Sequence, residues 1–178
     1  ENNCITNTSV FARSHSAPTQ NPWSTKIWEI QRNIGRSLNN DVYLFGEGMQ
    51  AIHSIEYSKL ESYFYLFGVR DCDTFLSWKD TEDYSFLLDI PTTPILFKGI
   101  VNSEKELREL TNEIYKPNES MLGGQMEGYV IRIADAFKQE DSHKYVLKYV
   151  RKNHITTDKH WTKNWKSANI NYNSKYGA

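Results

Sequence analysis

Short apolar runs alternate with longer amphipathic stretches along this chain, and that alternation constrains its fold more than any other feature. Five runs have the length and the aromatic or β-branched content of strands: residues 42–45, 62–69, 95–97, 128–133 and 145–150. Three stretches carry apolar side chains at helical spacing: residues 24–35, 77–88 and 103–115. The order of these elements contains no internal repeat and predicts an α+β domain in which antiparallel strands dominate.

Polar residues, glycine and proline mark the ends of these elements. Residues 3–12 read as two extended runs around Asn7-Thr8, which predicts a hairpin at the start of the chain. Ser24 is placed to cap the first helix, and the strand over residues 42–45 is expected to break at Gly46. Residues 117–125 predict a flexible connection. From Asn164 onward the chain has little to bury, so we expect a domain over residues 1–161 and a frayed polar tail over residues 162–178.

Bulk properties exclude several classes of protein. With 178 residues, the chain has the size of one ordinary domain. No apolar run approaches the roughly 20 residues that a membrane span needs, so we expect no membrane partner. Two cysteines, Cys4 and Cys72, are too few for a disulfide scaffold and lack the spacing of a zinc site, which favours a reduced, cytoplasmic setting. The net charge of −1 argues mildly against a protein that coats nucleic acid, but not against one that grips a few phosphates.

The tetrapeptide Phe45-Gly46-Glu47-Gly48 places a carboxylate between two glycines at the end of a strand. Glycines there let a ligand approach the backbone, and the carboxylate can accept hydrogen bonds from sugar hydroxyls. Taken alone, the same residues also fit an ordinary acidic turn.

A second motif, Glu127-Gly128-Tyr129-Val130-Ile131-Arg132, opens with a carboxylate at the mouth of a strand. Tyr129 and Ile131 share one face of that strand, and Val130 and Arg132 share the other. Such a glutamate suits Mg²⁺, which wants oxygen ligands and keeps several waters. The alternative is a surface glutamate beside a solvated strand.

A third motif, from Lys144 to Lys152, places Lys148 inside an otherwise apolar strand. An ammonium there must be partnered or must point into a cleft, and a triphosphate is one suitable partner. The alternative is a lysine at the end of a strand whose charge reaches solvent.

The order and spacing of these motifs resemble those of the bacterial and phage ATP-dependent RNA ligases, which are covalent nucleotidyltransferases. The resemblance covers residues 1–161 and is carried by six motifs in sequence: Ala12-Arg13-Ser14-His15, Phe45-Gly46-Glu47, Ser62-Tyr63-Phe64, Phe75-Leu76-Ser77-Trp78, Glu127-Gly128-Tyr129-Val130-Ile131-Arg132 and Lys148-Tyr149-Val150-Arg151. It implies the nucleotidyltransferase domain of RNA and DNA ligases, with mainly antiparallel sheets and flanking helices.

The resemblance also implies roles for individual residues. Arg13 resembles the arginine that contacts the nucleotide and the phosphate of the RNA end. Glu47 resembles the glutamate that binds the ribose, and Phe67 falls where the family places an aromatic that stacks on adenine. Glu127 resembles the carboxylate that helps to organise the metal, and Lys148 the lysine that holds the α-phosphate.

Two further arginines complete the implied nucleotide site, Arg132 and Arg151. Arg151 could replace a second lysine that the family usually has at the position of Val150. The implied cofactors are ATP, which supplies AMP, and Mg²⁺. The implied partner is RNA with 5′-phosphate and 3′-hydroxyl ends, joined through lysyl-AMP and adenylylated RNA.

The family's nucleophile lies in Lys-x-Asp-Gly, followed closely by Glu-Asn. Because this chain opens with Glu1-Asn2, we expect that tetrapeptide directly before residue 1. A non-enzymatic module of the same fold, which binds nucleotide or RNA ends without turnover, is the alternative hypothesis. His154 and His160, with Asp158 between them, suggest a metal site only weakly, and core or capping histidines are the better interpretation.

Overall fold

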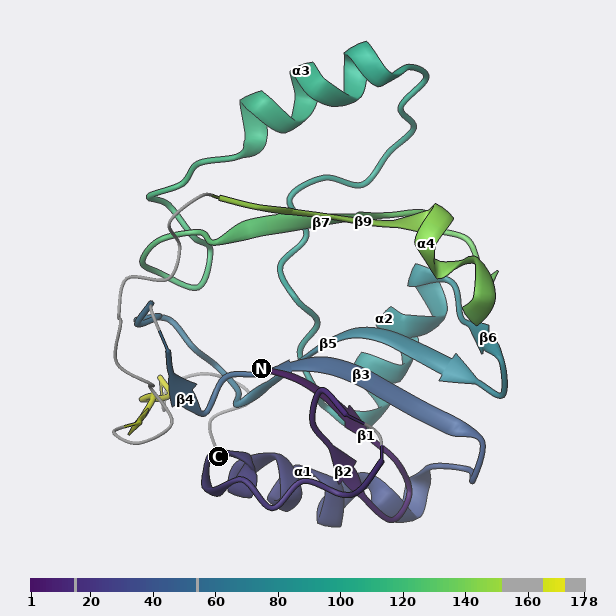
Figure 1. Ribbon diagram of the computed structural model, residues 1–178, viewed down its shortest axis with the longest axis vertical. Helices are drawn as coiled ribbons and strands as arrows, with labels where there is room; N and C mark the ends of the chain where they lie inside the picture. Colours follow the sequence, from purple (N-terminus) through teal and green to yellow (C-terminus); the bar gives the residue numbers. More distant parts are fainter. Residues whose placement is uncertain (15, 54, 152–164, 172–178) are drawn as a thin grey trace.

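The structure, a computed structural model, describes residues 1–14, 16–53, 55–151 and 165–171. Its main sheet is built from antiparallel pairs in the order β2-β1-β3-β5-β6-β8 (Figure 1). The strands are β1 (Asn2–Ile5), β2 (Val10–Phe11), β3 (Val42–Gly48), β5 (Phe64–Asp71), β6 (Thr74–Phe75) and β8 (Phe137–Lys138). The predicted hairpin at the start is confirmed, because β1 pairs with β2 through Cys4 with Phe11 and Ile5 with Val10. The predicted α+β class with antiparallel sheets is also confirmed.

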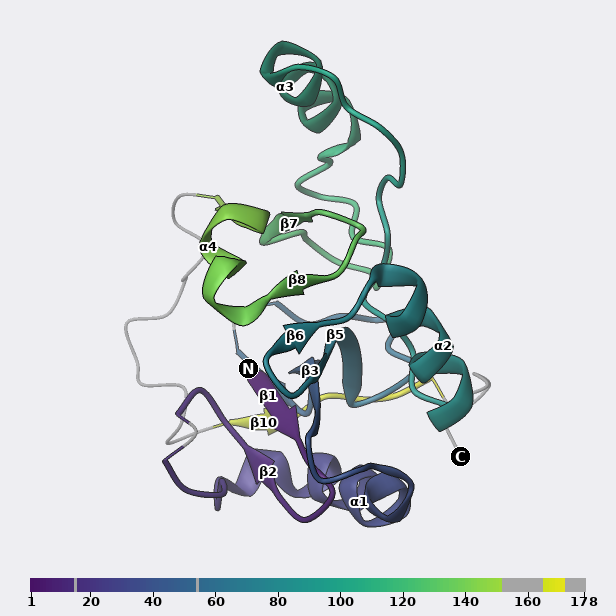
Figure 2. The ribbon, with the colours of Figure 1, turned by 90° about the vertical axis from the view of Figure 1, so that its right-hand side faces the viewer.

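Two helices cover one face of this sheet and close the hydrophobic core. They are α1 (Thr25–Ile34) and α2 (Trp78–Leu88), both seen in Figure 2. The core contains Ile27 and Ile34 from α1 together with Leu44, Phe64 and Leu66 from the sheet, all of them buried. The spacing that predicted the first helix therefore also identified its buried face.

The two helices begin differently. The Ser77 hydroxyl accepts from the backbone N–H of Asp80 at 3.1 Å and caps α2. The predicted cap of α1 is wrong in its chemistry, because the Ser24 side chain makes no capping bond. Instead, Oε1 of Gln50 accepts from the backbone N–H of Lys26 at 2.9 Å. An amide distant in sequence thus satisfies a donor at the helix start.

Strand β3 continues through Gly46, so the predicted break there is wrong. The pairing of β3 with β5 shifts between Phe45 and Gly46, where the partners change from Gly68 to Leu66 and leave Phe67 as an extra residue. A bulge of this kind redirects a side chain without ending the strand. Gly46 is required by packing, since a Cβ on it would lie 2.3 Å from the ring of Phe64.

A second, two-stranded sheet lies across the other face of the main sheet (Figures 1 and 2). It pairs β7 (Gly128–Arg132) with β9 (Val146–Val150) in antiparallel register. Before it comes α3 (Glu104–Ile114), which has no buried residue and lies beyond this sheet at the top of Figure 1. The short η3 (Gln139–Asp141) and α4 (Ser142–Tyr145) connect β8 to β9.

Two sequence predictions fail in the connecting segments. Residues 95–97 form no strand, and Ile95 and Phe97 are exposed. The frayed tail is wrong for residues 165–171, because β10 (Lys166–Ser167) pairs with β4 (Ala51–Ile52) and Ala168 is buried. The motif from His154 to Trp161 lies outside the described residues. No helix that the structure describes is long and apolar enough to cross a membrane.

Two glycines on the paired strands give a matched test of this packing. We expect Gly46→Ala to lower the free energy of unfolding by about 1–3 kcal/mol, because its Cβ would overlap the buried ring of Phe64. Gly68→Ala is the control, since a Cβ there would find its nearest neighbour at 3.6 Å. Chemical denaturation of both variants measures the difference, and equal losses would contradict the packing described for β3.

Candidate active site

The cleft between the two sheets is held by the side chain of Arg132, at the end of β7. Its Nη1 donates to the carbonyl oxygen of Phe67 and its Nη2 to that of Leu76, both at 3.1 Å. The guanidinium also lies over the rings of Trp78 and Phe137, 5.6 and 5.3 Å from their centres. Burial lowers the pKa of Arg132, but an arginine remains a cation at neutral pH. These contacts give Arg132 a structural role, and its expected contact with a nucleotide stays a prediction.

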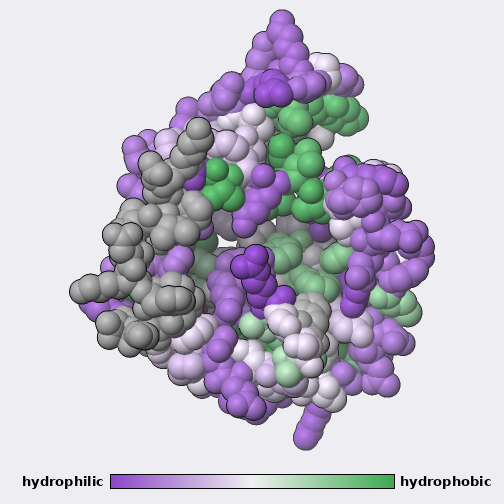
Figure 3. Space-filling model, in the orientation of Figure 1, coloured by the Kyte–Doolittle hydropathy of each residue, from purple (hydrophilic) through white to green (hydrophobic). Residues whose placement is uncertain are grey.

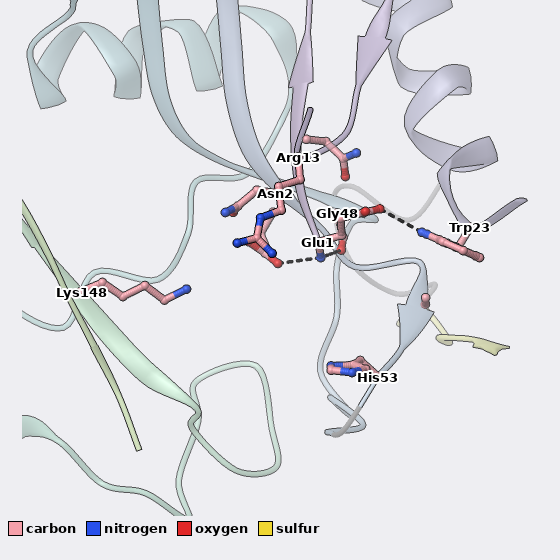
Figure 4. A pocket seen from close by; sticks show the side chains of 10 residues that line it. Glu1, Asn2, Arg13, Trp23, Gly48, His53 and Lys148 are labelled. Atoms are coloured by element: carbon pink, nitrogen blue, oxygen red, sulfur yellow. Dashed lines mark hydrogen bonds and ion pairs between the residues drawn. The ribbon is translucent and has the colours of Figure 1, made fainter. Parts of the chain in front are cut away.

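A cavity of about 450 Å³ opens at one end of the cleft (Figure 4). Figure 3 shows the molecule hollowed between its upper part and its lower body, with apolar residues along the walls. The cavity is lined by residues from β1, the end of β3, β4 and the residue after it, the segment after β2, and β9: Glu1, Asn2, Asn3, Arg13, Trp23, Glu47, Gly48, Ala51, His53 and Lys148. Arg13, Glu47 and Lys148, which are far apart in the sequence, are therefore brought to one pocket.

Glu47 stands at the pocket wall as the last residue of β3 before Gly48. Its Oε1 lies 2.7 Å from the backbone nitrogen of Glu1, and the side chain remains 39% exposed. The carboxylate of Glu1 in turn accepts from Nε1 of Trp23 at 2.9 Å. A carboxylate held at the wall of a pocket and still open to solvent can accept hydrogen bonds from a ligand's hydroxyl groups.

Lys148 reaches the pocket from the opposite sheet. It pairs with Val130 across β7 and β9, on the face opposite to the stacked rings of Tyr129 and Tyr149. Figure 4 shows its amine extending toward the side where Arg13 and Glu1 lie. The prediction that this lysine points into a cleft agrees with its place in the cavity lining, although β9, apolar in sequence, is largely exposed rather than buried. The strand is an open wall of the cleft, and an ammonium on it needs no buried partner.

The glycines beside Glu47 serve the protein's own packing. A Cβ on Gly48 would lie 2.1 Å from Oδ1 of Asn3, just as one on Gly46 would strike Phe64. These contacts give both glycines a packing role, and the expectation that they also let a ligand approach the backbone stays a prediction. Gly128 has a similar role, since its Cβ would lie 1.9 Å from the carbonyl oxygen of Tyr149. The glycines of both motifs let backbone and side chains approach closely and so fix where Glu47 and Glu127 stand.

Phe67 is the extra residue of the β5 bulge, and its ring is half-buried. It belongs to neither of the two buried clusters formed by the described residues, whereas Phe64 is fully buried in the main one. The bulge thus separates Phe67 from the buried core, but Phe67 is not among the residues that line the cavity, and its contact with adenine stays a prediction.

Glu127 and Arg151 lie together at the mouth of the smaller sheet. The backbone N–H of Arg151 donates to the carbonyl oxygen of Glu127 at 3.0 Å, and its Nη2 donates to Oε1 of Gln125 at 2.6 Å. Neither residue is among those that line the cavity. The structure therefore places them near the pocket's β7–β9 wall but does not bring them into its lining.

Tyr57 links the two carboxylates electrostatically and was missed from the sequence. Burial, together with the negative charges of Glu127 and Glu47, raises the pKa of Tyr57 to about 12. Its hydroxyl is therefore neutral at neutral pH, and its ring packs against the buried cluster of Leu60, Tyr65 and Ala168. Its position in a polar loop gave no signal in the sequence, because its burial depends on contacts distant along the chain.

The described residues contain no group of three or more histidine, cysteine, aspartate or glutamate side chains that could hold a metal ion. The expected contact of Glu127 with Mg²⁺ stays a prediction.

The Arg132 contacts can be tested by removing the charge. We expect Arg132→Gln to speed amide hydrogen exchange in β7 and β9 by about 10- to 100-fold, since hydrogen bonds from a charged group contribute about 1.5–3 kcal/mol. Arg108→Gln, on the exposed face of α3, is the control. Exchange in β7 and β9 that stays at the wild-type rate would show that Arg132 does not hold this sheet.

A family model described as RNA ligase matches residues 1–150. No curated protein and no solved structure matches the chain. The matched span contains the main sheet, the β7–β9 sheet and every described residue that lines the cavity. The chain therefore belongs to the RNA ligase family.

Proposed function

We propose that this protein is an ATP-dependent RNA ligase that joins a 5′-phosphate to a 3′-hydroxyl through lysyl-AMP and adenylylated RNA. The observation that carries the proposal is the convergence of Arg13, Glu47 and Lys148 on one cavity from three separate segments of the chain. Family membership supports the same chemistry. The domain would then have the nucleotidyltransferase fold, with its cleft as the nucleotide site.

Each residue has a role that its position supports. Glu47 accepts hydrogen bonds from the ribose hydroxyls, and Phe67 stacks on adenine from the bulge of β5. Lys148 binds the oxygens of the α-phosphate from the opposite wall. Arg13 binds the phosphate of the RNA end at the same cavity. Arg151, beside Glu127, adds positive charge at the mouth of β7 and β9.

The joining step explains why these charges should meet. The oxygen of the 3′-hydroxyl attacks the 5′-phosphorus, the phosphoanhydride bond to AMP breaks, AMP leaves with the electron pair, and the hydroxyl proton passes to solvent. Lys148 and Arg13 stabilise the negative charge on the phosphate oxygens during this displacement. Mg²⁺, when bound at Glu127, would add to this neutralisation.

The joining step needs no lysine nucleophile, so it can be tested directly. We expect the protein to seal a 5′-adenylylated RNA strand to a 3′-hydroxyl with Mg²⁺ and without ATP. Glu127→Ala should slow sealing by about 100-fold or more, because loss of metal-organised charge costs several kcal/mol. Glu113→Ala, on the exposed face of α3, is the control. A folded protein that binds AMP but yields no sealed RNA would favour the non-enzymatic binding module instead.

Adenine recognition gives a second test. Phe67→Ala should weaken AMP binding by about 1–3 kcal/mol through loss of one stacking face, by analogy with bases on aromatic side chains. Phe86→Ala, at a position 77% exposed on α2, is a better control than a change at the buried Phe64, which would unsettle the core. Isothermal titration of both variants measures the difference, and equal affinities would remove Phe67 from the nucleotide site.

A further inference from the structure

Arg70 is a charged side chain on the cleft wall that the proposed chemistry does not use. It lies on β5, opposite Tyr43 of β3 and Phe75 of β6. It shares a face with Gly68, whose Cβ direction points to Phe75 and to Arg132 of the smaller sheet. Arg70 therefore belongs to the face of the main sheet that looks into the cleft.

Two aromatic rings lie beside the guanidinium of Arg70 on that face. Its central carbon lies 4.2 Å from the centre of the Tyr43 ring and 5.6 Å from that of Phe45. Its charge also reaches Cys4 on β1, where it opposes the burial that raises the pKa of that thiol to about 11. The side chain thus extends from β5 over the rings of β3.

The donors of Arg70 are unused within the part of the chain that the structure describes. Its Nε is buried and has no hydrogen-bond partner, and the side chain forms no ion pair with a described residue. The side chain as a whole is only half-buried, so its terminal N–H groups remain open to a ligand in the cleft. A guanidinium stacked on a ring keeps its in-plane N–H groups free, and these match the oxygens of a phosphate.

We propose that Arg70, seated on Tyr43 and Phe45, binds a backbone phosphate of the RNA strand at a position away from the joint. The inference rests on the proposed function, since it extends the RNA path along the cleft. Tyr43, the partner of Arg70, precedes Glu47 by four residues on β3, which corresponds to roughly 14 Å. The ribose of the adenosine is placed at Glu47 in the proposed function. At that distance from the ribose, Arg70 suits a phosphate of a neighbouring RNA nucleotide better than a phosphate of the same ATP.

The aromatic rings beside Arg70 fit the same ligand. Phe45 contacts Phe75, and Phe75 stacks on Phe137, with ring centres 5.3 Å apart in both pairs. A row of rings beside a cation is the arrangement by which single-stranded nucleic acid is held without sequence preference.

The test measures RNA binding by fluorescence anisotropy at about 50–200 mM salt, with AMP titration of the same variants. Each phosphate contact contributes about 0.7 to the slope of log affinity against log salt for a single strand. Arg70→Gln should reduce that slope by about this amount and weaken RNA binding about tenfold, with AMP affinity unchanged. Arg70→Lys should retain the slope but not the full affinity. Arg32→Gln, on α1 behind the opposite face of the sheet, should change neither.

A scan of the RNA locates the contact. Replacing one linkage at a time by a neutral methylphosphonate should weaken binding to wild type at the contacted position but have no further effect on Arg70→Gln there. A slope unchanged by Arg70→Gln, additive losses at every linkage, or an equal loss of AMP affinity would each overturn the inference while leaving the proposed function in place. A wild-type protein that binds no RNA would instead remove the proposed function, and this inference with it.

Discussion

One guanidinium joins two sheets that share no strand, and the geometry of the cleft depends on it. Arg132 extends from β7 and donates to carbonyls of Phe67 on β5 and of Leu76, just beyond β6. The carbonyl of Phe67 is free to accept because the bulge removes this residue from the pairing with β3. The same local irregularity therefore provides both the anchor for the smaller sheet and the aromatic ring that we place against adenine.

Close packing then determines where the charges stand around this cleft. Gly46, Gly48 and Gly128 each lie against a neighbour that a Cβ would strike. This close packing restricts where Glu47 on β3 and Glu127, directly before β7, can lie. Glu47 and Lys148 line the same cavity from different sheets. Such a site is assembled only when both sheets are in place, which explains why no single motif in this chain has a clear function on its own.

Much of the architecture could be predicted from local patterns. The helical spacing of Ile27 and Ile34, and the serine before α2, gave the right elements because burial and capping are local properties. The failures involve partners distant in sequence: Gln50 caps α1, and residues 166–167 extend β4 although their composition is polar. The predictions for the site residues also succeeded in part and failed where the contacts are distant in sequence. Sequence resemblance proposed Arg13, Glu47 and Lys148, which do share a cavity, but it could not assign Arg132 to backbone carbonyls or reveal Tyr57.

We propose that the cleft between the two sheets binds the adenosine nucleotide, and an NMR titration of backbone amides with AMP tests this site directly. The largest shifts are expected at Glu47 and Gly48, at Phe67 and Gly68, and along β9 near Lys148, with small changes in α1 and α2. A contrary result is saturable AMP binding that shifts amides on the α1 and α2 side of the main sheet and leaves these three segments unchanged. It would show that the nucleotide binds outside the cleft.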